Sequence, residues 1–185
     1  MIDIETFGVD PGCVITSIAA VPFNLPLEGR LERLEGFRVN VDIQSCMTEG
    51  LVINGDTLTW WMNQKPGLMR AMAQGSVPLR HALKRLAGYC ESSKSVFVWS
   101  HGATFDIPIL DWAYKQVGFN VPWSYRGVRD TRTIYWSAHT LYQWEPKRLG
   151  KAPPDKHDPL ADAHRQVSMV QEVWMVLLKG GKIDE

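Results

Sequence analysis

The chain has 185 residues, of which 45% are hydrophobic and 22% are charged, and its 20 acidic residues balance its 20 basic ones. This composition favours a single domain over residues 1–185 and excludes long disordered segments. Zero net charge excludes a protein that coats nucleic acid through its overall charge, so any such binding must come from a local basic patch or from metal ions. Three scattered cysteines, with no apolar run of signal or membrane length, predict a cytoplasmic protein with no membrane contact.

The first part of the chain predicts an antiparallel meander of three strands. Residues 2–5 alternate apolar and acidic side chains. Residues 14–23 follow a turn at Asp10-Pro11-Gly12, and residues 34–41 form the third segment of strand type. Strands that follow one another through short turns usually pair with their neighbours in the chain.

Three helices are predicted next. The first runs from Asp56, its N-cap, to residue 64, the second begins at Pro66, and the third is capped by Ser76. The third helix carries leucines at helical spacing, namely Leu79, Leu83 and Leu86.

Strands then alternate with helices. Residues 96–99 predict a short buried strand, residues 104–117 a helix, and residues 126–130 a last strand before a helix that runs through Ala138. This order predicts an α/β domain with a mixed five-stranded sheet, in which three antiparallel strands precede parallel ones and helices flank the sheet.

The C-terminal part predicts a loop and one long helix. Residues 143–155 are rich in proline, glycine and lysine, which is typical of a loop. Asp158 caps the final helix, Pro159 occupies its first turn, and Gly180-Gly181 ends it.

Asp3 and Glu5 are the first candidate site residues. They lie two residues apart on the first strand, so both carboxylates point to the same face. Two adjacent acids on a core strand repel each other and resist burial. Mg²⁺ or Mn²⁺ would offset that cost, because hard cations prefer oxygen ligands. Solvated acids at an exposed strand end are the alternative interpretation.

Further candidates lie at two predicted helix starts. Asp106 falls in a first turn directly after a strand, where open α/β sheets place their sites. An aspartate favoured there by the helix dipole is the alternative. Asp162 lies one turn into the final helix, and His157 precedes its cap. The alternatives are a plain cap with an exposed acid, or the metal dyad of an HD-type phosphohydrolase, for which His164 alone supplies too few further ligands.

Together these residues follow the order of the DEDDh exonucleases, which include proofreading subunits, oligoribonuclease and ribonuclease T. The matching residues are Asp3, Glu5, Asp106, His157 and Asp162, and Thr6 and Phe105 match as well. A closer resemblance is to phage and prophage exonucleases similar to exonuclease A of T-even phages, and to a mycobacterial-type 3′-5′ exoribonuclease. Three runs carry it: residues 59–64 (TWWMNQ), 105–110 (FDIPIL) and 129–132 (RDTR). Relatives usually have more strand before the first aspartate than Met1-Ile2.

The resemblance implies a ribonuclease H-like fold and hydrolysis of single-stranded DNA or RNA from the 3′ end to nucleoside 5′-monophosphates. It also implies two Mg²⁺ or Mn²⁺ ions. Asp3, Glu5 and Asp162 would hold one ion, and Asp3 and Asp106 would hold the second. His157 is implied to be the general base that deprotonates the attacking water, a task that suits an imidazole near neutral pH. Several relatives form dimers, so a homodimer is expected as well.

Substrate contacts are expected around these motifs. Thr6 and Phe105 adjoin the acidic residues, and Phe7 is expected to stack against the terminal base. A core position is the alternative for Phe7. Basic side chains crowd the loop before His157 and are expected to contact the phosphate backbone, with a solvated loop as the alternative. They are Lys147, Arg148, Lys151 and Lys156.

Other interpretations complete the sequence reading. Trp60 and Trp61 are interpreted as core or dimer contacts, and Asp130 as a helix cap. A nuclease of the ribonuclease H or integrase type competes with the exonuclease, but such sites lack the spacing between His157 and Asp162. A nucleic-acid-binding module on a degenerate nuclease fold is the alternative from another class. Such a module would have little reason to keep four mutually repelling carboxylates.

Overall fold

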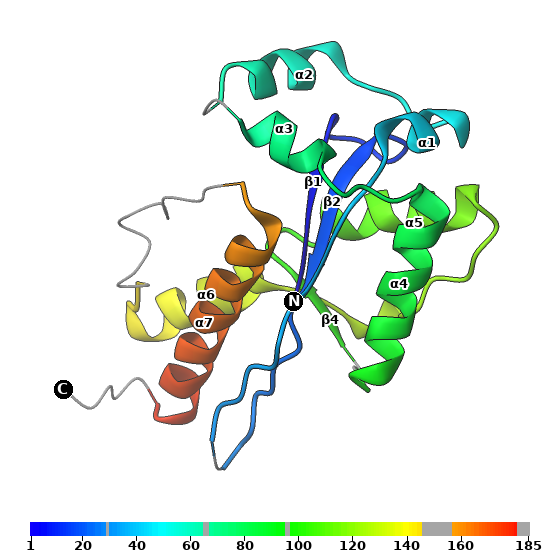
Figure 1. Cartoon of the computed structure of the whole chain (residues 1–185). Helices are drawn as coiled ribbons and strands as arrows, with labels where there is room; N and C mark the ends of the chain where they lie inside the picture. The colour runs from blue at the N-terminus through cyan, green and yellow to red at the C-terminus, as the bar shows by residue number, and fades with distance from the viewer. Residues whose placement is uncertain (29, 65–66, 95–96, 146–156, 181–185) are drawn as a thin grey trace.

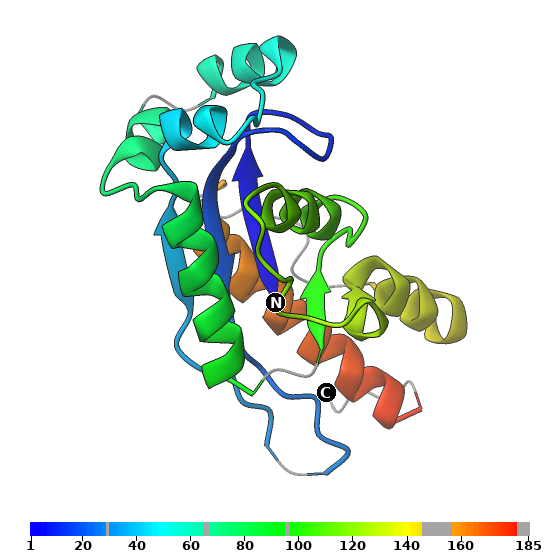
Figure 2. The same cartoon turned by 90° about the vertical axis from the view of Figure 1, so that its right-hand side faces the viewer.

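Helices cover both sides of a central group of strands (Figures 1 and 2). The computed structural model describes residues 1–28, 30–64, 67–94, 97–145 and 157–180. One side is covered by α4 (Leu79–Ser92) and α5 (Asp106–Gln116), and the other by α6 (Thr131–Tyr142) and α7 (Pro159–Leu178). Three short helices lie at one end of the strands, namely α1 (Ile43–Thr48), α2 (Gly55–Met62) and α3 (Leu68–Ala73). No helix among the described residues is long and apolar enough to cross a bilayer.

The strands form two small sheets. The strands β1 (Ile2–Thr6), β2 (Ile15–Ala20) and β3 (Phe37–Asn40) pair antiparallel in that order, which confirms the predicted meander. A 3-10 turn (Tyr125–Gly127) leads into β5 (Val128–Asp130), which pairs in parallel with β4 (Val98–Ser100). The five predicted strands are therefore present, although as a three-stranded and a two-stranded sheet.

β4 lies beside β1 in space (Figure 2). Within the described residues no backbone ladder joins these two strands. The backbone N–H of Ile4 donates instead to Oδ1 of Asp106, at 3.1 Å. A carboxylate of the candidate site thus accepts a backbone hydrogen bond from the strand that carries the first two acids.

Two predicted helix caps are wrong. α2 is capped by Asn54, whose Oδ1 accepts from the backbone N–H of Thr57 at 2.9 Å, and not by Asp56. α4 begins after Pro78 and not at Ser76. The first backbone N–H of α4 donates to the hydroxyl of a serine in α1, a helix that the sequence pattern did not predict. That cap comes from a distant part of the chain, so local rules do not reveal it.

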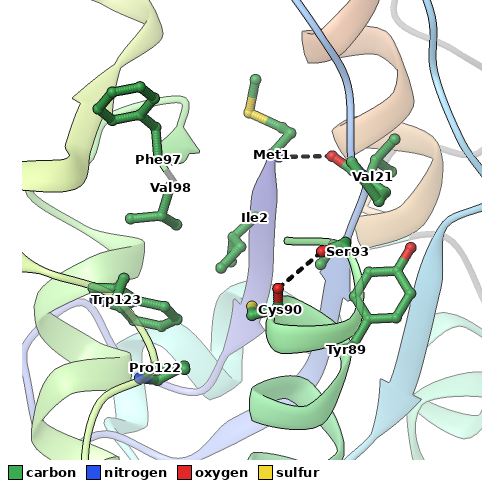
Figure 3. Close-up of a pocket in the computed structure, with 12 residues that line it drawn as sticks. Met1, Ile2, Val21, Tyr89, Cys90, Ser93, Phe97, Val98, Pro122 and Trp123 are labelled. Carbon is green, nitrogen blue, oxygen red and sulfur yellow. Dashed lines mark hydrogen bonds between the residues drawn. The ribbon is translucent and has the colours of Figure 1, made fainter. Parts of the chain in front are cut away.

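The main apolar core lies between the antiparallel sheet and helices α4 and α5. Its buried side chains include Ile2, Ile4, Ile15, Ile18, Leu79, Leu83, Leu86, Ile107 and Leu110. Figure 3 shows the start of β1, where Ile2 lies with Cys90, Val98 and Trp123 around a cavity of about 30 Å³. The amino group of Met1 is buried there and donates to the carbonyl of Val21 at 2.8 Å.

Candidate active site

Three predicted acidic residues lie together where β1 meets α7. Alternation along β1 directs Asp3 and Glu5 toward α7, away from the core that holds Ile2 and Ile4. Asp162 lies in the first turn of α7 and is buried. One carboxylate oxygen from each acid lies within 4.8 Å of the other two, a spacing that suits a shared metal ion.

Asp106 reaches the same region from the start of α5. Its side chain is 3% exposed, and its two oxygens accept from the backbone N–H of Ile4 and from the hydroxyl of Ser100. Burial raises the pKa of this carboxyl to about 6, although both hydrogen bonds oppose the rise. Negative charge on Asp106 also raises the pKa values of Asp3 and Glu5, so the four acids influence one another.

The acids of the cluster disfavour one another's ionised forms. Burial and the charge of Asp106 raise the pKa of Asp3 well above its ordinary value. Burial and the charge of Asp3 raise the pKa of Glu5 to about 9. Among the residues that the structure describes, Arg165 pairs with the cluster, and its Nη2 donates to Oδ1 of Asp162 at 2.9 Å. Buried, mutually repelling oxygen donors fit a hard divalent cation.

His157 lies at the edge of this cluster. Its Nδ1 is 4.0 Å from Oε1 of Glu5, and its backbone N–H donates to Oδ2 of Asp162 at 3.2 Å. Its φ of 72° lies in the left-handed region, which non-glycine residues rarely adopt and which recurs at functional sites. The next residue, Asp158, caps α7 as predicted by accepting from two backbone N–H groups, and it pairs with Arg38 of β3.

Two tryptophans of α2 hold the imidazole edge-on. The ring centroids of Trp60 and Trp61 lie 5.0 and 5.4 Å from that of His157. Trp61 is 3% exposed and donates from Nε1 to the carbonyl of Thr6, which confirms the core interpretation for this residue. Trp60 is 45% exposed, so one face of the site remains open to solvent beside an aromatic ring. The sequence offered no signal for the contact between these rings and His157.

A pocket of about 530 Å³ adjoins Glu5. Thr6 and Phe105 line it together with Trp60 and Trp61, although the Thr6 hydroxyl already donates to the carbonyl of Gly8 at 2.6 Å. Most of its lining is apolar. The pocket therefore offers a surface for a flat, weakly polar group directly beside the acidic cluster.

Phe7 does not line this pocket. Its side chain is 2% exposed and packs in the main core, so base stacking by Phe7 does not fit the structure and the alternative core position does. The pairing of β1 with β2 shifts register between Glu5 and Thr6. The alternation that would have turned Phe7 toward the site is interrupted there, and its N–H donates to the carbonyl of Val14.

Other predicted residues have separate outcomes. Asp130 caps α6 through the N–H of Arg132 at 2.8 Å, which confirms its structural interpretation, and it also accepts from the N–H of Ala103. Four basic side chains were predicted to contact the phosphate backbone of the substrate, and all four lie outside the described residues. They are Lys147, Arg148, Lys151 and Lys156.

Comparison with known proteins identifies the family. A family profile described as the 3′-5′ exoribonuclease Rv2179c-like domain matches residues 1–174. No curated protein matches the chain. The profile match confirms the resemblance that the acidic and histidine motifs indicated, and the family description implies a hydrolase whose substrate is nucleic acid. The chain therefore belongs to the Rv2179c-like family of 3′-5′ exoribonuclease domains.

Proposed function

We propose that this chain is a single domain of ribonuclease H-like fold that hydrolyses single-stranded RNA or DNA one nucleotide at a time from the 3′ end. The products are nucleoside 5′-monophosphates and a shortened strand. Family membership supports the direction and the use of RNA. The observation that carries the proposal is the cluster of Asp3, Glu5 and Asp162, with ligand oxygens within 4.8 Å of one another beside His157.

The donor set supports metal dependence. Asp3, Glu5 and Asp162 would hold one Mg²⁺ or Mn²⁺ ion, and Asp3 and Asp106 would hold a second. When bound, such ions neutralise charge on the scissile phosphate and stabilise the attacking and leaving oxygens. Four carboxylates offset the four positive charges of two divalent ions. Raised pKa values of Asp3 and Glu5, caused by burial and mutual repulsion, agree with a site whose acids need cations to be ionised.

His157 is proposed as the general base, because a ring nitrogen at the edge of the acidic cluster can accept the proton of an attacking water. The rings of Trp60 and Trp61 restrict the orientation of the imidazole. The backbone N–H of His157 also donates to Asp162, which couples the base to a proposed metal ligand. Ring contacts and this backbone hydrogen bond thus hold the proposed base beside the acidic cluster.

The pocket beside Glu5 is proposed to receive the terminal base. Its aromatic lining, from Trp60 and Phe105, suits a base of any sequence, because every base has a face that can stack. This arrangement favours a single strand, since a base must leave its duplex partner to enter such a pocket. The order of three antiparallel strands followed by a parallel pair supports the proposed fold.

The test is a timed digest of RNA and DNA strands of matched sequence, labelled at either end, with Mg²⁺ or Mn²⁺. A 5′ label should appear in a descending ladder, and a 3′ label should appear at once as a mononucleotide. Activity should disappear with a chelator and return with the metal. Internal fragments at early times, or mononucleotides released first from the 5′ end, would contradict the proposal.

A further inference from the structure

Gln166 lies on the same face of α7 as Asp162, because four residues complete about one helical turn. Its side chain is 5% exposed, which is unusual for a polar residue. Its Nε2 donates to Oδ1 of Asp3 at 2.7 Å. One helix thus presents an acid of the cluster and, one turn later, an amide that touches another acid of the cluster.

The contact has a chemical consequence for Asp3. Oδ1 of Asp3 accepts from the Gln166 amide, so this hydrogen bond holds the carboxylate in one orientation. An amide fixes the direction of a carboxylate without neutralising it. A lysine or arginine at position 166 would bring a positive charge that competes with a divalent cation. A neutral donor therefore orients Asp3 for a cation without adding a positive charge that would compete with it.

The amide oxygen of Gln166 also supports a role in the acidic cluster. Oε1 of Gln166 is buried, and within the described part of the chain it has no hydrogen-bond donor. Buried acceptors of this kind are rare in proteins and call for a specific explanation. A water molecule held among the carboxylates can supply the missing donor. The amide would then bridge the two, because Nε2 donates to Asp3 and Oε1 would accept from the water.

We propose that Gln166 is a positioning residue that orients Asp3 for cation binding. The inference rests on the proposed metal-dependent function. Partners that orient metal ligands typically change metal affinity by 10–100-fold when they are removed. Loss of the amide should therefore appear first as weaker binding of the cation and only through that as slower hydrolysis.

The experiment compares the Gln166→Met variant with the wild type in a titration with Mn²⁺ followed by calorimetry or by the magnetic resonance signal of free Mn²⁺. Methionine keeps the length and bulk of the side chain but removes both polar atoms. We expect the dissociation constant for Mn²⁺ to rise roughly 10–100-fold. Gln171→Met is the matched control, because Gln171 lies on the same helix and donates to the carbonyls of Asn24 and Glu32, away from the acids.

A second measurement separates positioning from a general loss of structure. Hydrolysis by Gln166→Met should recover most of its kcat when Mn²⁺ is raised above the new dissociation constant, and thermal unfolding of the metal-free variant should stay cooperative. If Gln166→Met does not fold, Gln166→Asn takes its place, since its amide is too short by one methylene to reach Asp3. If Gln166→Met or its substitute Gln166→Asn binds Mn²⁺ as tightly as the wild type, the proposed role of Gln166 is overturned, but the proposed function is not. A wild type that binds no Mn²⁺ would overturn the proposed function itself.

Discussion

The two faces of β1 carry opposite chemistry within five residues. Ile2 and Ile4 are 3% and 4% exposed and pack toward α4 and α5, where each buried side chain contributes about 1.5–3 kcal/mol. Asp3 and Glu5 point the other way, toward α7, where burial and mutual repulsion raise their pKa values. One face therefore stabilises the fold, whereas burial of mutually repelling acids on the other face opposes it.

This difference explains why the site is built on a strand and not on a loop. Carboxylates that repel one another move apart unless the backbone holds them. The apolar face of β1 provides that constraint, because Ile2 and Ile4 are buried in the main core. Burial of the apolar face thus offsets the cost of holding the carboxylates close together on the other face. Functional sites commonly reduce stability in this way.

The largest expected effect comes from neutralising the acidic face. Each variant should lose activity on the order of 10⁴-fold, because metal ions contribute several kcal/mol of transition-state stabilisation and each 1.36 kcal/mol is tenfold in rate. The variants are Asp3→Asn, Glu5→Gln, Asp106→Asn and Asp162→Asn. Single-turnover rates at saturating metal provide the measurement.

Two controls accompany these variants. Asp111→Asn makes the same chemical change on α5, and it keeps the oxygen that accepts from Trp123 Nε1, so its rate should be close to that of the wild type. The metal-free site variants should unfold at the same temperature as the wild type or higher, because repulsion in the cluster is relieved. Substantial activity in any two of the four site variants would end the assignment of two metal ions.

His157→Ala should lose roughly 10²–10⁴-fold in rate, the usual contribution of a general base. Affinity for Mn²⁺ should change little, because the hydrogen bond from His157 to Asp162 comes from its backbone, and its Nδ1 lies 4.0 Å from Glu5. A base must be unprotonated to act, so the wild-type rate should rise with pH and then become constant. The variant should lack this rising limb of the rate–pH profile. If the variant keeps the same rising limb, another group titrates and His157 only positions the substrate.

The resemblance to the DEDDh exonucleases predicted which acids belong together, and local patterns account for the place of several of them on their own elements. Strand alternation is enough to pair Asp3 with Glu5, and the Asp158-Pro159 start signal is enough to put Asp162 in the first turn of α7. The direction of Phe7 could not be predicted, because the register shift in β1 depends on how β2 pairs with it.

Contacts between distant segments were beyond the sequence for a related reason. Trp60 reaches His157 only because α2 folds over the end of β1, and Gln166 reaches Asp3 only because α7 crosses the sheet. Each of these residues has an ordinary local interpretation, as a core aromatic or a helical polar residue. Tertiary packing gives them their place in the site, and no periodicity within one segment encodes that packing.

The apolar face should respond to mutation in the opposite way. Ile4→Ala removes a buried side chain and should cost about 2–5 kcal/mol of unfolding free energy, whereas Ile4→Val should cost about 0.5–1.5 kcal/mol. Chemical denaturation of the metal-free protein measures both. The Mn²⁺ affinity of the folded variants, corrected for any unfolded protein, should stay within about twofold of the wild-type value if the two faces act separately. A large change in affinity with little loss of stability would show that the apolar face tunes the site directly.

The smallest expected effect is a pH dependence of stability in the metal-free protein. Burial and the neighbouring acids raise the pKa of Glu5 from 4.5 to about 9 on folding. The folded state therefore holds a proton that the unfolded state has released across this window. The contribution of Glu5 is fully present below the unfolded pKa and is lost as pH rises through the folded pKa. Asp3 and Asp106, whose pKa values are also raised by burial, act in the same direction.

The metal-free wild type should accordingly unfold a few degrees lower at about pH 8 than at about pH 6, since about 1 kcal/mol corresponds to roughly 2–4 °C in a domain of this size. Glu5→Gln should reduce the slope because position 5 no longer titrates, whereas Glu91→Gln, an exposed change on α4, should leave it intact. Mn²⁺ should reverse the trend, because it binds the ionised carboxylates and its stabilisation grows as they lose protons. If unfolding temperature falls with pH equally in the wild type and in Glu5→Gln, Glu5 does not titrate with a raised pKa. The proposed contrast between the acidic and apolar faces of β1 would then be wrong.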